Sequence, residues 1–276
     1  MKFVRKFWKQ LVLAALALLF VCGAAYLFSS RQKSSPLPSV TVARPATSTR
    51  STQPASQPIS HIFIIVEENE TAQAILGNSA APYLNQLAKE GAVALNYSAV
   101  AHPSLPNYLA LTSGSTDGIS TDCNPPGAGC IVNVANVADL IEKSGRSWKE
   151  YAESMPSACY TLNDGQYATK HNPFIYYQDI VNNAARCNDH VVPYAQLSSD
   201  LKSSATTPNF GFITPNLCND MHNCGIAQGD AWLASNVGQI LNSAAFRSTK
   251  SLLIITWDEG NLSNNHVLTI FAGTIA

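Results

Sequence analysis

The sequence of 276 residues contains little charge of either sign. Asp, Glu, Lys and Arg make up 13% of the chain, and the formal net charge is −1. No basic patch stands out, so the charge pattern gives no sign of a nucleic-acid partner. The sequence also lacks the glycine-rich motifs of dinucleotide-binding and P-loop proteins and the GxSxG turn of serine hydrolases. A serine carboxyl-hydrolase is therefore a weak candidate.

Acidic residues are missing from the first 60 positions. Four basic residues lie within the first ten positions and precede an uncharged stretch from Leu11 to Phe28. As a helix this stretch is about 27 Å long, just enough to cross a bilayer core. The basic flank favours a cytoplasmic N-terminus and export of the rest. Residues 1–28 are predicted to be an uncleaved signal anchor, with the chain on the extracytoplasmic face of the membrane, or a signal peptide cleaved near Gly23-Ala24-Ala25, with the chain secreted.

Residues 29–60 are predicted to be a disordered linker. They contain five prolines, many Ser and Thr residues and no acid, so they cannot bury enough apolar surface to fold. The remaining residues, 61–276, have a length that suits one α/β domain.

The cysteine spacing CxxC is absent as well. An even number of cysteines in an exported domain indicates disulfides, and pairing each with its neighbour in sequence is the simplest of fifteen connectivities. A zinc site is the open alternative, which the spacing does not favour. Beyond Cys22, the six cysteines are Cys123, Cys130, Cys159, Cys187, Cys218 and Cys224.

Three strand-like apolar segments, residues 61–66, 209–214 and 251–256, each end in polar side chains. Helix-like segments lie between them, which predicts a mostly parallel sheet. The strongest are 133–143, capped by Asn133, and 230–245, capped by Asp230. Residues 153–208 read as an irregular insertion over the strand edge. Shorter elements are a helix and strand over 81–94, a strand over 146–152 and a last strand over 267–272.

The carboxyl ends of these three segments carry the most informative residues. Glu67, Glu68 and Asn69 follow the first, while Asp258 and Glu259 follow the third. Asp220 and His222 follow the second segment within eight residues. Ligands of open α/β sheets bind at this edge, and oxygen donors with one His suit a divalent cation.

Ser104 is the candidate nucleophile. It precedes the helix-like segment 109–113, and a helix N-terminus attracts anions such as phosphate. A serine in this position attacks phosphorus if a metal lowers the pKa of its hydroxyl. Taken alone, the local sequence favours a simple helix cap over a nucleophile.

Five ordered motifs together resemble the phosphoesterase family of bacterial acid phosphatases and phospholipase C enzymes, in the alkaline phosphatase superfamily. The similarity runs from about residue 60 to the end and is greatest to secreted acid phosphatases, including ones that act on phosphoinositides. It implies an alkaline-phosphatase-like sandwich, with a mostly parallel central sheet and helices on both faces. The motifs are Val66-Glu67-Glu68-Asn69, His102-Pro103-Ser104-Leu105-Pro106-Asn107-Tyr108, Lys170-His171-Asn172-Pro173-Phe174, Pro215-Asn216-Leu217-Cys218-Asn219-Asp220-Met221-His222 and Thr256-Trp257-Asp258-Glu259.

The resemblance implies a divalent metal ion held by Glu68 and Asn69 from the first motif and by Asp258 and Glu259 from the last. The identity of the ion does not follow from the sequence.

The same resemblance implies the catalytic residues. Ser104 falls at the nucleophile and Asn107 at an amide that steadies the phosphoryl oxygens. His171 belongs to a motif expected near the phosphate. Asp220 and His222 lie where relatives carry a second metal site or the acid that protonates the leaving group.

The sequence thus predicts an exported, metal-dependent acid phosphatase that hydrolyses monoesters of small molecules or lipid headgroups through a phosphoseryl intermediate. A histidine acid, with an ordinary pKa of about 6.5, fits an acidic optimum. The alternatives are a phospholipase C-type phosphodiesterase and a non-catalytic module that binds a phosphorylated ligand. Relatives usually continue past the strand at 267–272 into a His-Tyr-Ser segment, whereas this chain stops at Ala276, so we expect a C-terminally truncated form.

Overall fold

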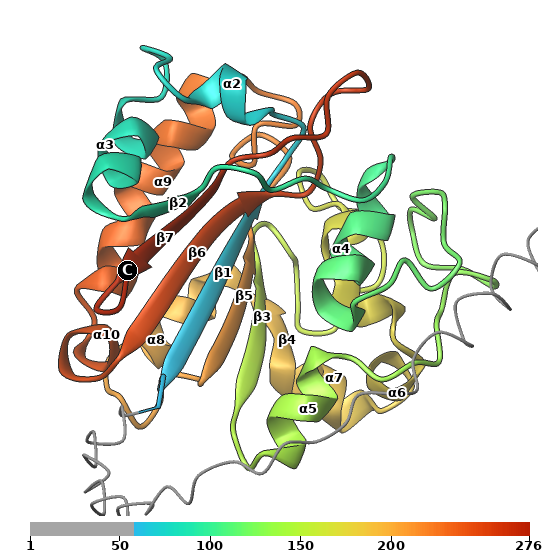
Figure 1. Ribbon diagram of the computed structural model, residues 1–276. Coiled ribbons are helices and arrows are strands. Elements are labelled where there is room, and N and C mark those ends of the chain that lie inside the picture. The colour runs from blue at the N-terminus through green and yellow to red at the C-terminus, as the bar shows by residue number, and fades with distance from the viewer. Residues whose placement is uncertain (1–57) are drawn as a thin grey trace, which may run out of the picture. The chain divides into compact units, whose positions relative to one another are not determined.

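A seven-stranded sheet runs through residues 58–276, the part of the chain that the computed structural model describes. Its order is β2-β7-β6-β1-β5-β3-β4 (Figure 1). The strands from β6 to β4 are parallel, and β7 pairs antiparallel with both β6 and β2. The strands are β1 (His61–Glu67), β2 (Ala92–Ala94), β3 (Trp148–Ala152), β4 (Val191–Pro193), β5 (Phe210–Thr214), β6 (Ser251–Trp257) and β7 (Thr269–Gly273).

Helices cover both faces of this sheet (Figure 1). One apolar core holds side chains of α2 (Ala72–Ile75), α3 (Pro82–Glu90), α8 (Leu197–Asp200), α9 (Ile226–Leu241) and α10 (Ala244–Ser248). The other core holds side chains of α4 (Ser104–Ser113), α5 (Val137–Lys143), α6 (Gln178–Val181), α7 (Ala184–His190) and the 3-10 turn η2 (Pro173–Tyr176). The predicted α/β architecture, with a mostly parallel sheet between two helical layers, is confirmed.

The three segments predicted to end at one edge are β1, β5 and β6, which are neighbours at the centre of the sheet. Ile65 lies opposite Ile213 in β5, and Glu67 lies opposite Trp257 in β6. The carboxyl ends of these strands therefore come out side by side, because parallel strands in this register finish together.

The predicted membrane segment, residues 1–28, and the linker up to residue 57 lie outside the described residues. Within residues 58–276, no helix combines the length and the apolarity needed to cross a membrane.

The helix predicted from Asn133 begins later, at Val137, with Asn136 as its N-cap. The Asn136 side chain accepts hydrogen bonds from Ala138 N and Asp139 N, and the Asp139 carboxylate accepts one from Asn136 N in return. This reciprocal capping box satisfies more backbone donors than a lone cap at Asn133.

The helix predicted from Asp230 begins earlier, at Ile226, so Asp230 does not cap it. Its buried carboxylate instead accepts hydrogen bonds from Tyr83 N (3.1 Å) and Leu84 N (2.8 Å), at the first turn of α3. Asp230 therefore caps a neighbouring helix from a distant part of the chain. A carboxylate at the positive end of that helix is favourable for the same reason as a local cap.

Residues 153–208 were predicted to be irregular, and this is wrong. The segment contains α6, α7, α8 and the edge strand β4, together with the short 3-10 turns η1 (Thr169–His171), η2 and η3 (Tyr194–Gln196). Each element is three to seven residues long, too short to show a clear hydrophobic period.

The predicted nearest-neighbour disulfides are confirmed. Cys123 bonds to Cys130, Cys159 to Cys187 and Cys218 to Cys224. The zinc alternative is thereby excluded for these six side chains, because a sulfur in a disulfide is not a thiolate ligand.

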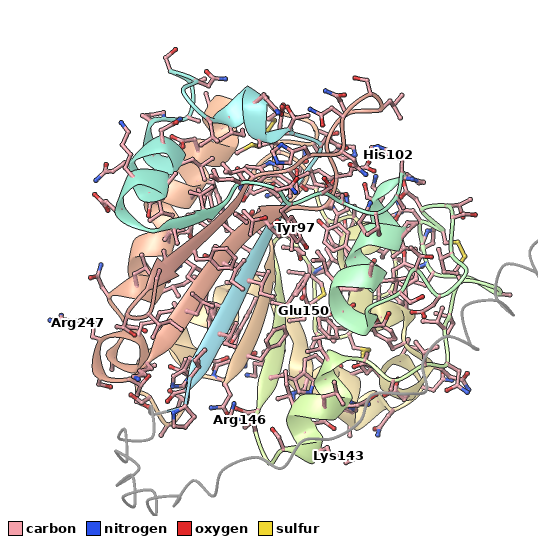
Figure 2. The ribbon with its side chains drawn as sticks, viewed as in Figure 1. Tyr97, His102, Lys143, Arg146, Glu150 and Arg247 are labelled. Atoms are coloured by element: carbon pink, nitrogen blue, oxygen red, sulfur yellow. A yellow bond between two sulfur atoms is a disulfide. The ribbon has the colours of Figure 1, made fainter. Side chains whose placement is uncertain are left out.

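Glu150 is an acid in the interior of the sheet, in the middle of β3 (Figure 2). It is 0% exposed. One carboxyl oxygen accepts a 2.8 Å hydrogen bond from the Thr214 hydroxyl, and the other has no partner among the described residues. Burial raises the pKa of Glu150 well above its ordinary value of 4.5, and the Thr214 hydrogen bond opposes this only in part.

Replacing this acid is expected to stabilise the protein in a pH-dependent way. A raised pKa in the folded state means that stability is full below the unfolded pKa and is lost as pH rises toward the folded pKa. Relative to Glu150→Gln, the wild type should lose about 1.4 kcal/mol per pH unit above pH ~4.5 until the folded pKa is reached. Urea unfolding of both proteins from pH 4 to 8 measures the difference, in which all other groups cancel. A constant difference across this range would contradict the raised pKa.

Candidate active site

Glu68 lies at the centre of the candidate site, one residue beyond the end of β1. It is 0% exposed. Its Oε2 accepts a 3.2 Å hydrogen bond from the Ser104 hydroxyl, and its Oε1 accepts a 2.7 Å hydrogen bond from the Tyr108 hydroxyl. His171 Nε2 lies 3.0 Å from Oε1. Burial raises the pKa of Glu68, nearby Asp258 adds to the rise, and the Tyr108 hydrogen bond opposes it.

Backbone hydrogen bonds fix this acid relative to the neighbouring strands. Glu68 N donates to the carbonyl of Asp220 (2.8 Å), and Asp258 N donates to the carbonyl of Glu67 (3.0 Å). Asn69 adopts a left-handed conformation with φ 62°, which turns the chain so that its N–H lies 3.3 Å from Asp258 Oδ1. Its amide also donates to Glu68 Oε2 (3.4 Å). Thus Glu68, Asn69 and Asp258 converge.

Ser104 is the first residue of α4, and its hydroxyl does not cap that helix. The side chain is 1% exposed and donates to Glu68 instead. Burial and then Glu259 raise the pKa of Asp258, while the Ser104 hydroxyl lowers it. The hydroxyl therefore lies between two acids, at the N-terminus of a ten-residue helix.

The fourth predicted metal ligand, Glu259, has a different partner. Its Oε2 lies 2.6 Å from Nδ1 of His102, which precedes Pro103 and Ser104. Burial raises the pKa of Glu259, and His102 opposes this rise. Glu259 is joined to the other predicted ligands only through its neighbour Asp258, and its role as a ligand stays a prediction.

The side-chain amide of Asn107 forms hydrogen bonds with backbone groups of the loop before Ser104. Its oxygen accepts hydrogen bonds from Val100 N (3.0 Å) and Ala101 N (2.9 Å). Its nitrogen donates to the carbonyls of Ala101 (3.0 Å) and Pro103 (3.3 Å). Asn107 thereby braces the loop before Ser104, and its predicted contact with phosphoryl oxygens stays a prediction.

His171 lies between two carboxylates. Its Nε2 is 3.0 Å from Glu68, and its Nδ1 is 3.1 Å from Asp220 Oδ2. Its ring stacks on Tyr108, with centroids 5.4 Å apart. Burial lowers the pKa of His171 well below its usual range, and the positive charge of Lys170 adds to this. The ring of His171 therefore lies between the carboxylates of Glu68 and Asp220 and separates them.

Asp220 joins His171 to His222. Its Oδ1 accepts a 2.8 Å hydrogen bond from the backbone N–H of His222, while Oδ2 contacts His171. Burial raises the pKa of Asp220 to about 7, and the His222 backbone hydrogen bond and charge oppose the rise. His222 Nδ1 lies 2.8 Å from Asn223 Oδ1, which fixes the ring.

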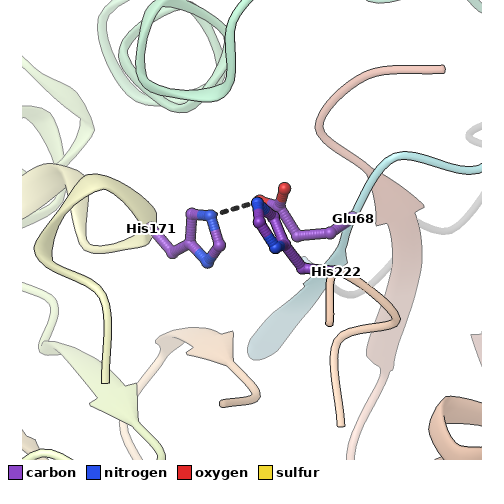
Figure 3. Close-up of side chains that lie close together, drawn as sticks. All are labelled: Glu68, His171 and His222. Carbon is purple, nitrogen blue, oxygen red and sulfur yellow. Dashed lines mark ion pairs between the residues drawn. The ribbon is translucent and has the colours of Figure 1, made fainter. Parts of the chain in front are cut away.

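A metal ion fits this edge of the sheet. Glu68, His171 and His222 each offer a ligand atom within 4.8 Å of the others (Figure 3). Buried Asp258 Oδ2, Asp220 Oδ2 and His171 Nε2 have no hydrogen-bond partner of good geometry among the described residues. Buried polar atoms of this kind are rare without an unseen ion or water. The donors, carboxylates with imidazole, suit divalent transition metals such as zinc or manganese.

Sequence reasoning missed three side chains of this site. Tyr108 lies one helical turn after Ser104, a spacing that puts both on one face of α4. Lys170 adjoins His171 in the same motif, and its Nζ lies 3.2 Å from His222 Nε2. Asp122 contacts Lys170 Nζ at 3.1 Å, and no sequence signal singles it out because it lies outside every motif.

A sequence model of the Phosphoesterase family matches residues 76–275. A phosphatidylinositol-3-phosphatase of Mycobacterium tuberculosis is 36% identical over 215 residues, which cover 77% of this chain and 68% of the relative. A phosphate-repressible acid phosphatase of Penicillium chrysogenum is 34% identical over 200 residues, 69% of this chain and 47% of the relative. An acid phosphatase of Aspergillus fumigatus is 33% identical and is matched over 43% of its length. This chain thus spans less than half of each fungal relative.

Among solved structures, a protein of the alkaline phosphatase superfamily from Vibrio parahaemolyticus aligns with a TM-score of 0.57 at 13% identity. The alignment covers 79% of this chain and 61% of the other. At this identity the likeness concerns the fold, and it confirms the predicted alkaline-phosphatase-like architecture.

Tyr108→Phe is expected to lower the free energy of unfolding by about 1–3 kcal/mol, since buried Glu68 then loses its shortest hydrogen bond. Tyr177→Phe is the matched control. It also removes a buried phenol hydroxyl, yet its partner Thr112 keeps the carbonyls of Tyr108 and Leu109 as acceptors. Urea unfolding with a chelator present compares the two. Equal losses of unfolding free energy in the two variants would show that the hydrogen bond from Tyr108 to Glu68 contributes no more than that of an ordinary buried phenol.

Proposed function

Because the chain belongs to the phosphoesterase family, we propose that it is an exported, metal-dependent acid phosphatase acting on phosphate monoesters through a phosphoseryl intermediate. One observation carries the proposal: the Ser104 hydroxyl, at the N-terminus of α4, donates to buried Glu68 beside Asn69 and Asp258. A nucleophile, carboxylate and amide oxygens and a positive helix end are the parts that phosphoryl transfer requires.

Glu68, Asn69 and Asp258 would hold the divalent ion, with Glu259 as the fourth predicted ligand. When bound, the ion supplies positive charge that lowers the pKa of the nucleophile and neutralises phosphoryl oxygens. Asp258 Oδ2 supports this role, because it is buried and has no hydrogen-bond partner of good geometry among the described residues.

Ser104 Oγ attacks phosphorus, and its proton leaves toward Glu68 Oε2, the acceptor of its hydrogen bond. The new Oγ–P bond forms as the bond from phosphorus to the leaving alcohol oxygen breaks. Water then attacks phosphorus as the Oγ–P bond breaks. The water gives a proton to His222, Glu68 returns its proton to Ser104 Oγ, and inorganic phosphate leaves. Asn107 contributes by bracing the loop before Ser104 and, as the motif predicts, by contacting the phosphoryl oxygens.

His222 protonates the leaving alcohol in this proposal. One of its ring nitrogens lies within 4.8 Å of ligand atoms of Glu68 and His171, so the ring adjoins the acid that holds the nucleophile. His171 is less suited, because both its ring nitrogens face carboxylates in the interior. It serves instead to position Asp220 and Glu68.

The substrate class rests on the relatives' names. Acid phosphatase and phosphatidylinositol-3-phosphatase both describe monoester hydrolysis, which favours monoesters of small molecules or of phosphoinositide headgroups. Three disulfides within residues 123–224 support an exported protein. A phospholipase C-type enzyme would cleave a phosphodiester faster than a monoester, and a binding module would release no phosphate.

Ser104→Ala and Asp258→Asn are expected to lower kcat for p-nitrophenyl phosphate by about 10³-fold or more, since the first removes the nucleophile and the second a ligand of the ion. Asp258→Asn should also lower the bound metal, measured by elemental mass spectrometry. Ser113→Ala, at the other end of α4, is the matched control and should keep the wild-type rate. Wild-type turnover by folded Ser104→Ala protein would reject the nucleophile.

The acid is tested by varying the leaving group. His222→Asn should slow hydrolysis of an alkyl phosphate by about 10²-fold or more. It should slow that of p-nitrophenyl phosphate far less, since p-nitrophenolate leaves without a proton. His102→Asn is the comparison, because His102 pairs with Glu259 at the same edge. If His102→Asn alone gives the leaving-group effect, the acid is His102 and the assignment to His222 fails.

A further inference from the structure

Lys170 is a cation held inside the candidate site. It belongs to the 3-10 turn η1, and its side chain is 11% exposed. Its Nζ lies 3.1 Å from Asp122 Oδ2 and 3.2 Å from His222 Nε2. A lysine buried to this degree loses much hydration and side-chain entropy, so its location calls for a compensating role.

The positive charge of Lys170 acts on three acids of the site. Burial raises the pKa of Glu68, Asp220 and Glu259, and in each case the Lys170 ammonium opposes that rise. The ammonium is therefore close enough to act on the whole acidic edge. Figure 3 shows the ring of His222, its contact, beside Glu68 and His171.

Lys170 places a positive charge beside the cluster of Glu68, His171 and His222. Its Nζ lies 3.2 Å from His222 Nε2, and Nδ1 of the same ring lies 2.8 Å from the side-chain amide oxygen of Asn223. Like charges this close repel each other, so the ammonium competes with a second cation for this side of the cluster.

Asp122 links Lys170 to α4, the helix that begins with Ser104. Its Oδ2 contacts Lys170 Nζ, and its Oδ1 accepts a 3.3 Å hydrogen bond from Leu105 N, the residue after Ser104. Asp122 itself precedes Cys123, which is bonded to Cys130. Asp122, next to this disulfide loop, thus contacts both the Lys170 ammonium and the first turn of α4.

We infer that Lys170 binds the phosphoryl group of the substrate and supplies the second positive charge on it, in place of a second metal ion. The inference rests on the proposed function of this site. An ammonium has three donors, and Asp122 and His222 use two of them. The third serves a phosphoryl oxygen. Because a monoester dianion gains more from an added cation than a diester monoanion, Lys170 favours monoesters.

The experiment measures binding of inorganic phosphate by titration calorimetry to metal-loaded Ser104→Ala protein, which retains the site without turnover. Adding Lys170→Met should weaken phosphate binding about tenfold or more, as expected for a charge-assisted hydrogen bond. Lys149→Met is the matched control, since it removes the lysine of another partly buried ion pair, with Asp200, and should leave phosphate affinity unchanged. Affinity within twofold of the parent for Lys170→Met would overturn the inference.

Lys170→Gln provides a second uncharged variant if Lys170→Met does not fold, with the same expected loss. A double-mutant cycle with Asp122→Asn tests the positioning role of Asp122. Asp122→Asn should change phosphate affinity when Lys170 is present and have no further effect once Lys170 is replaced. If Asp122→Asn changes phosphate affinity by the same factor with and without Lys170, the coupling between the two residues is rejected.

Activity separates this inference from the proposed function. If the wild type does not hydrolyse p-nitrophenyl phosphate, the proposed function fails. If the wild type is active and Lys170→Met lowers kcat/KM for p-nitrophenyl phosphate and for bis-p-nitrophenyl phosphate equally, only the role of Lys170 in monoester preference fails. A larger loss for the monoester is the expected result.

Discussion

The burial of three acids at one edge of the sheet is the constraint on which the rest of the site depends. Glu68, Asp220 and Asp258 are at most 1% exposed, and burial raises the pKa of each. Such a cluster is stable only with protons, donors or cations beside it. The hydroxyls of Ser104 and Tyr108, the ring of His171 and the ammonium of Lys170 meet part of that need. Asp258 Oδ2 and Asp220 Oδ2 still have no hydrogen-bond partner of good geometry among the described residues.

The central part of this arrangement could be predicted from sequence. Buried parallel strands are continuous apolar runs, so β1, β5 and β6 are visible in the chain, and the polar residues after them mark the edge where ligands bind. The register of Glu67 opposite Trp257 then brings Glu68 and Asp258 together. The nearest-neighbour disulfides were the simplest connectivity, and two of them close loops with sequence separations of 7 and 6.

What could not be predicted are contacts between segments with no local signal. Asp230 looks like the cap of its own helix, yet it caps α3 from 146 residues away. Asp122 lies outside every motif and still holds Lys170. Asn107 and Glu259 lie where the family resemblance puts them, but their hydrogen bonds go to the loop before Ser104 and to His102. Only tertiary packing determines such partners, so residue type and spacing leave them open.

The six-residue separation of Cys218 and Cys224 encloses both Asp220 and His222. Two of the proposed catalytic residues are therefore carried on a small covalent ring that exists only after oxidation. In a reducing compartment the ring is open, and Asp220 and His222 depend on weaker contacts for their orientation. The geometry of this part of the site therefore depends on the oxidation state of Cys218 and Cys224.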